Sequence, residues 1–92
     1  MENIVNKICA VYDMPVANIL LKSTKREYSN IRNYVYYILH YDYAYSISQI
    51  AKFFNRCKRE INYRISETKY RISCVSSYKE EYDFILSQLN KE

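Results

Sequence analysis

Residues 46–72 read SISQIAKFFNRCKREINYRISETKYRI, and this stretch decides the fold. Ser46 followed by Gln49 is a capping-box pattern, in which the serine hydroxyl accepts from an amide of the first helical turn and the glutamine reaches back to the amide of Ser46. The pattern predicts a helix over 46–54. Asn55 suits the left-handed conformation that ends many helices.

A second helix is predicted over 58–72, after a turn of about three residues. The side chains that would face the core recur there at helical spacing; they are Ile61, Ile65, Thr68 and Ile72. Two helices joined by a tight turn are typical of a helix-turn-helix. In that motif the second helix enters the major groove of DNA and presents donors and acceptors to the base edges.

Three further helices are predicted before this stretch, over residues 2–12, 15–20 and 26–41. Asp13 supplies a cap and Pro15 a first-turn proline for the short second helix. The apolar stripe over 31–39 fits helical spacing, although its tyrosine and valine content also suits a strand. We interpret it as a helix because the stripe persists for more than two turns.

The last predicted helix runs over 77–90, where Ser77 and Glu80 repeat the capping-box pattern. A chain of 92 residues is the size of one domain with one core. The sequence therefore predicts a single all-α domain over 1–92, a bundle of five to six helices that contains a helix-turn-helix.

Positive charge is concentrated in two segments. Leu20 to Val35 holds four bases against Glu27, a net charge of +3, and Lys52 to Arg71 holds seven bases against two acids, a net charge of +5. The whole chain has a net charge of only +4, so the remainder is acidic. Basic segments of this kind attract phosphate backbones, acidic proteins or anionic membranes, and nucleic acid is favoured if the two segments meet in space.

Composition excludes several other classes. The chain has no glycine, so it lacks a glycine-rich loop to cradle a nucleotide. Its three cysteines are widely spaced and odd in number, which fits reduced thiols better than a disulfide framework or a metal site. No apolar run is long enough to span a membrane or to serve as a signal peptide. We therefore expect a cytoplasmic protein without cofactor or metal.

The chain resembles the C-terminal, origin-recognising domain of the bacterial replication initiator DnaA, whose fold is grouped with the Trp repressor. That family has a segment similar to V-A-x-Y-Y-x-I-x-V-x-D-L-L, where residues 8–20 read ICAVYDMPVANIL. It then has an R-Q pair, matched by Arg32-Asn33, and fourteen residues after that arginine the motif S-L-x-E-I, matched by residues 46–50 at the same separation. The match is gapless over 8–54.

The departure falls on the part of the family that reads bases. Where the family continues G-G-R-D-H-T-T-V, residues 55–61 read NRCKREI, one residue shorter. Only Arg56 and the apolar Ile61 correspond. The resemblance therefore implies the fold, the docking geometry and the use of double-stranded DNA. It does not imply the family's target sequence, and the family's ATPase domain has no counterpart in this chain.

The predicted DNA contacts lie in three places. In the basic loop and the helix after it, side chains would bind phosphates, which position a protein without specifying sequence: Lys22, Ser23, Thr24, Lys25, Arg26, Arg32 and Asn33. In the turn and the recognition helix, side chains would reach base edges or the nearby backbone: Arg56, Lys58, Arg59, Glu60, Asn62 and Tyr63. A simple solvated face is the alternative interpretation of both groups.

Tyrosine is unusually abundant, with 12 in the chain. Five tyrosines between 36 and 45 cannot all face one core, so some must be exposed or at an interface, where tyrosine is enriched. A protein partner or a homodimer through this surface is the second hypothesis for function. Half-buried packing explains the tyrosines equally well. An enzyme is not expected, because His40 is the only histidine and no local motif pairs it with a cysteine.

Overall fold

The computed structural model describes residues 1–20 and 26–90. These residues contain six helices and no strand: α1 (Glu2–Val11), α2 (Val16–Leu20), α3 (Arg26–Tyr41), α4 (Ile47–Phe54), α5 (Lys58–Cys74) and α6 (Ser76–Leu89). The all-helical prediction is thereby confirmed. The segment 31–39, which also suited a strand, is helical.

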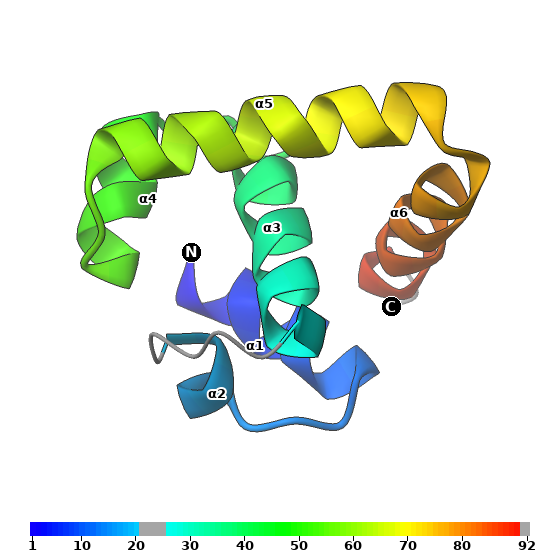
Figure 1. Ribbon diagram of the computed structural model, residues 1–92. Helices are drawn as coiled ribbons and strands as arrows, with labels where there is room; N and C mark the ends of the chain where they lie inside the picture. The colour runs from blue at the N-terminus through cyan, green and yellow to red at the C-terminus, as the bar shows by residue number, and fades with distance from the viewer. Residues whose placement is uncertain (21–25, 91–92) are drawn as a thin grey trace.

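The helices surround α3, which stands beneath the middle of α5 (Figure 1). In the same view α4 lies beneath the first half of α5 and α6 beneath its last half. Helices α1 and α2 pack at the end of α3 that is remote from α5. The upper side of α5 in this view is left uncovered along its length.

One hydrophobic core receives side chains from all six helices. Helix α3 contributes most of it, and α5 contributes the predicted inner positions Ile61, Ile65, Thr68 and Ile72. The ring of Tyr36 meets that of Phe54 edge-on, with 4.9 Å between the ring centroids. This contact joins α3 to the end of α4, where the predicted tight turn begins.

Both predicted ends of α4 are confirmed. The Ser46 hydroxyl accepts from the amide of Gln49 at 3.1 Å, and the Gln49 side chain accepts from the amide of Ser46 at 2.9 Å. Asn55 ends the helix with φ 54° and ψ 50°, in the left-handed region. Its amide and that of Arg56 then bond to carbonyls of the last turn of α4, which satisfies groups that a helix end leaves open.

Three predicted boundaries are wrong in detail. Helix α6 begins at Ser76 after Val75, without a side-chain cap, so Ser77 lies inside the helix and the second capping box does not form. Helix α5 continues to Cys74 rather than ending at 72, because α5 and α6 share Val75 as their common boundary. Asp13 does not cap α2. It takes φ 52° and closes the end of α1, and α2 begins after Pro15.

Left-handed backbone appears at three described positions. Two of them, Asp13 and Asn55, are of the residue types that adopt this conformation most readily after glycine, whereas the third, Ala44 with φ 60°, is not. Ala44 lies in the connection between α3 and α4, and the next amide, that of Tyr45, bonds to the carbonyl of Leu39 at 3.0 Å. Closure of this short connection therefore imposes the conformation on an alanine.

Candidate nucleic-acid interface

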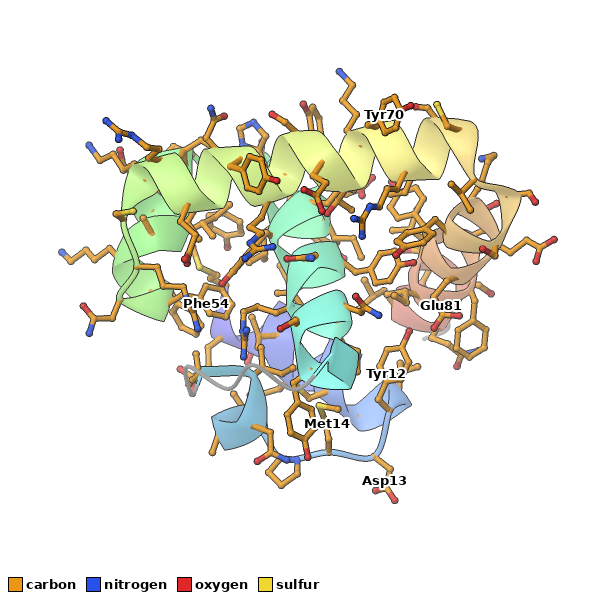
Figure 2. All side chains as sticks on the ribbon, in the orientation of Figure 1. Tyr12, Asp13, Met14, Phe54, Tyr70 and Glu81 are labelled. Atoms are coloured by element: carbon orange, nitrogen blue, oxygen red, sulfur yellow. The ribbon has the colours of Figure 1, made fainter. Side chains whose placement is uncertain are left out.

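The first turns of α5 present polar side chains to solvent. Lys58, Arg59 and Asn62 are exposed, and Tyr63 retains 59% of its accessible surface. Tyr70, in the last turns of α5, lies on the uncovered side of this helix and is exposed as well (Figure 2). The first turns thus carry two cations, an amide and a phenol on a surface that no described element covers.

The turn before α5 is fixed by an ion pair. Nη1 of Arg56 donates to Oε2 of Glu60 at 2.9 Å, and the Arg56 side chain is only 12% exposed. Glu60 is half-buried. Glu60 was predicted to accept from a base. In the structure its carboxylate is instead engaged by Arg56, so it holds the turn against the first turn of α5.

Arg32 does not lie on the exposed surface where a phosphate contact was predicted. It is 5% exposed, and its Nε donates to the carbonyl oxygen of Ile19 at 2.8 Å. The bond satisfies a carbonyl in the last turn of α2, a group that a helix end leaves open. Arg32 therefore ties the second turn of α3 to the end of α2, immediately before the segment 21–25.

A small cavity of about 20 Å³ lies between α3 and the first half of α5. It collects four of the predicted residues, Arg32, Asn33, Arg56 and Glu60, and three that the sequence did not single out: Ser29, Tyr36 and Arg64. The missed residues lie one helical turn from predicted ones, since Tyr36 follows Arg32 by four positions and Arg64 follows Glu60 by four. Helical periodicity applied to the predicted residues would have found them.

The charge around this cavity is positive, with three guanidinium groups and the Glu60 carboxylate. Burial lowers the pKa of Arg32, and the nearby cations Arg56 and Arg64 act in the same direction. Burial raises the pKa of Tyr36 to about 12, against the opposing effect of Arg56 and Arg32. The phenol therefore stays neutral and keeps its proton to donate.

A second, open hollow lies at the N-terminus of α5. It has a volume of about 420 Å³ and is lined by Asn55, Arg56, Cys57 and Glu60. A helix N-terminus carries amides without intrahelical partners and a partial positive charge, both of which favour anions. The cavity and this hollow share Arg56 and Glu60, so the two positive sites are neighbours.

Four of the predicted contacts, Lys22, Ser23, Thr24 and Lys25, lie outside the described residues. Arg26 opens α3. The end of α2 and the start of α3, which flank the basic loop in the sequence, lie on the side of the molecule remote from α5 (Figure 1). At a rise of about 1.5 Å per residue, the start of α3 is roughly 9 Å along the helix from Arg32.

A larger hollow, of about 430 Å³, lies on the other side of α3. Its walls include Tyr12, Tyr34, Tyr78 and Glu81. The Tyr12 hydroxyl donates to Oε1 of Glu81, and Figure 2 shows the two side chains pointing toward one another, across α3 from Phe54. This hollow gathers tyrosines from α3 and α6 and from the end of α1.

The five tyrosines between 36 and 45 differ in burial, and some are exposed, as expected from the sequence. Tyr36 is buried, Tyr37 and Tyr45 are half-buried, and Tyr41 and Tyr43 are exposed. His40 is half-buried, and its Nδ1 lies 2.9 Å from the carbonyl oxygen of Tyr45. The ring thus helps to close the same connection that contains Ala44.

Within residues 1–20 and 26–90, histidine, cysteine and acidic side chains form no cluster of three suited to a metal ion. No helix in that part of the chain is both long and apolar enough to cross a bilayer. Comparisons of the chain with protein-family models, curated proteins and solved structures give no match.

Proposed function

We propose that this protein binds double-stranded DNA, with the first turns of α5 in the major groove and the edge between α3 and α5 on the phosphate backbone. One observation carries the proposal. Arg32 and Asn33 from the first basic segment line the same cavity as Arg56 and Arg64 from the second. The exposed Lys58 lies directly beyond the turn that holds Arg56.

This arrangement supports the geometry expected from the resemblance to the DnaA C-terminal domain, namely a helix-turn-helix formed by α4 and α5 on a Trp repressor-like fold. An α-helix fits the major groove, which is about 12 Å wide. The cationic turn at the start of α5 would then lie against the backbone beside that groove.

Base readout, on this proposal, falls to Arg59 and Asn62. Arginine makes bidentate hydrogen bonds to guanine, and asparagine does so to adenine, each worth about 1–3 kcal/mol of discrimination. Glu60 is not assigned this role, because its Oε2 already accepts from Nη1 of Arg56. The two readers are three positions apart, so they lie on the same face of the helix.

The test is the affinity for a fluorescently labelled duplex, measured by anisotropy at two or more salt concentrations. The double variant Lys58→Ala/Arg59→Ala should bind at least tenfold more weakly. The slope of log affinity against log salt should be about 0.9 smaller in magnitude, because Lys58 would contact a phosphate and Arg59 a base. The control Lys7→Ala/Lys79→Ala removes the same charge from α1 and α6 and should keep most of the affinity and the slope. Equal losses in both double variants would contradict the assignment of α5.

A second candidate function is binding of a protein partner through the tyrosine-lined hollow between α3 and α6. The observation that favours it is the size of that hollow, about 430 Å³, with three tyrosines in its walls. A wild-type protein that fails to bind duplex at low salt would favour this alternative over DNA binding.

A further inference from the structure

The hydroxyl group of Tyr36 is a buried polar group without a hydrogen-bond partner among the described residues, 1–20 and 26–90. Tyr36 as a whole is 1% exposed. A buried hydroxyl left in this state costs about 1–3 kcal/mol. The side chain lines the small cavity between α3 and α5, so a group that enters the cavity can reach the hydroxyl.

The chemistry of the cavity wall selects the kind of group that fits. Arginine side chains carry only donors, and the neutral Tyr36 hydroxyl can donate as well. The one carboxylate in the wall, that of Glu60, is already paired with Arg56 at 2.9 Å. The wall therefore carries net positive charge and a buried phenol without a partner in the described part of the chain, which favours an anionic occupant over a neutral water.

The size of the cavity limits the occupant to a single atom. About 10–15 Å³ of such space holds one water, and the cavity has about 20 Å³. An oxygen atom at the corner of a larger anion has that size. Ser29, Asn33 and Arg64 are half-buried, so they form the side of the cavity that reaches the surface.

We propose that this cavity receives one non-bridging oxygen of a phosphate group, bound by the Tyr36 hydroxyl and the surrounding guanidinium groups. The rest of the phosphate stays at the surface beside Asn33 and Arg64. The phosphate belongs to the DNA backbone, and in this respect the inference rests on the proposed function. It adds a fixed backbone contact that would set how deeply α5 enters the groove.

Tyr36→Phe tests the proposal because it removes the hydroxyl and keeps the ring that packs on Phe54. Loss of a hydrogen bond to a charged group should weaken duplex binding about tenfold. The loss should be the same for every duplex sequence, and the salt slope should not change, because no charge is removed. The free protein should be at least as stable as the wild type, since the variant no longer buries an unsatisfied hydroxyl.

Tyr34→Phe is the matched control, because Tyr34 is a buried tyrosine of α3 that faces the hollow on the other side. It should keep its duplex affinity within twofold of the wild type. Tyr36→Phe affinity equal to that of Tyr34→Phe would overturn the proposal, as would a Tyr36→Phe protein that is both weaker in binding and less stable.

A second arm uses inorganic phosphate, titrated at constant ionic strength and followed by amide NMR. Saturable shifts in α3 and α5 that are several-fold weaker in Tyr36→Phe are expected. If the wild type binds phosphate in this way but binds no duplex, the anion site stands and both the DNA source and the proposed function fail. If phosphate causes no saturable shifts, the cavity holds only a water and the inference fails, whatever the duplex result.

Discussion

At the scale of single residues, the absence of glycine has its clearest consequence at Ala44, an alanine in the left-handed conformation. The left-handed region costs an L-residue with a Cβ about 1–2 kcal/mol, and asparagine and aspartate are the usual exceptions. Asn55 and Asp13 follow that rule, and composition alone predicts such residues at helix ends. Ala44 could not be predicted, because its conformation follows from closing the connection between α3 and α4.

Ala44→Gly should therefore raise the free energy of unfolding by about 0.5–1 kcal/mol, since relief of the left-handed penalty exceeds the entropy that glycine adds to the unfolded chain. Urea denaturation followed by circular dichroism measures it. The same substitution in a helix, Ala10→Gly in α1, should lower stability by up to about 1 kcal/mol. A loss of stability in both variants would show that Ala44 is not strained.

Arg32 shows the limit of sequence reasoning at a single position. The sequence places an arginine in a basic segment, which predicts an exposed cation, but the bond from its Nε to Ile19 buries it. Arg32→Lys keeps the charge and loses this geometry, so it should cost about 1.5–3 kcal/mol of stability in the absence of DNA. An unchanged urea midpoint in Arg32→Lys would mean that the bond contributes little.

At the scale of the elements, local sequence signals predicted helix ends and buried faces correctly wherever no tertiary contact opposed them. The Ser46 box, the Asn55 end and the periodic faces of α3, α4 and α5 are short-range features, and the structure has them where the sequence places them. The pattern at Ser77 failed because α5 runs on to Cys74 and leaves only Val75 between the two helices. Packing of α5 on α6 overrides the capping preference there.

Substitution of Ser46 and of Ser77 by alanine should affect stability differently. Ser46→Ala should cost about 1 kcal/mol, because it removes a hydroxyl that accepts from the Gln49 amide. Ser77→Ala should leave stability unchanged or slightly raised, because alanine has the higher helix propensity within a helix. Thermal unfolding of both variants measures the two effects. A loss of stability in Ser77→Ala comparable to that in Ser46→Ala would contradict the absence of a capping box at Ser77.

At the scale of the whole molecule, buried phenols are found on both sides of α3. Burial raises the pKa of Tyr34 and of Tyr36 to about 12, above the ordinary value of about 10. The folded state therefore favours the neutral phenols. The stability they contribute is fully present below pH 10 and is lost as the pH rises toward 12.

Alkaline unfolding should accordingly be cooperative between about pH 10 and 12. Tyrosinate absorbance and far-ultraviolet circular dichroism should change together for the buried phenols. Tyr34→Phe should make stability fall less steeply with pH, because one of the linked groups is gone. Full ionisation of all tyrosines with helix content intact would contradict the burial of these side chains.

The candidate site was predictable as a set of residues but only partly as an arrangement. Basic patterning identified Arg56, Lys58 and Arg59, and the spacing of four residues between Arg56 and Glu60 is a local signal for their ion pair. No local signal shows that Tyr36 of α3 lies beside the cations Arg56 and Arg64. That proximity depends on contacts of α3 with α5 and the turn before it, which are far apart in the sequence. The same long-range contacts bring the two basic segments together and carry the functional proposal.

The most direct test of that proposal is an amide NMR titration of the whole protein with a short duplex. Shifts should appear together in the first turns of α5, in the turn at Arg56 and along α3 from Ser29 to Tyr36, while the surroundings of Tyr12 and Glu81 remain unchanged. Shifts confined to the tyrosine-lined hollow, or the absence of any saturable shift, would contradict the account.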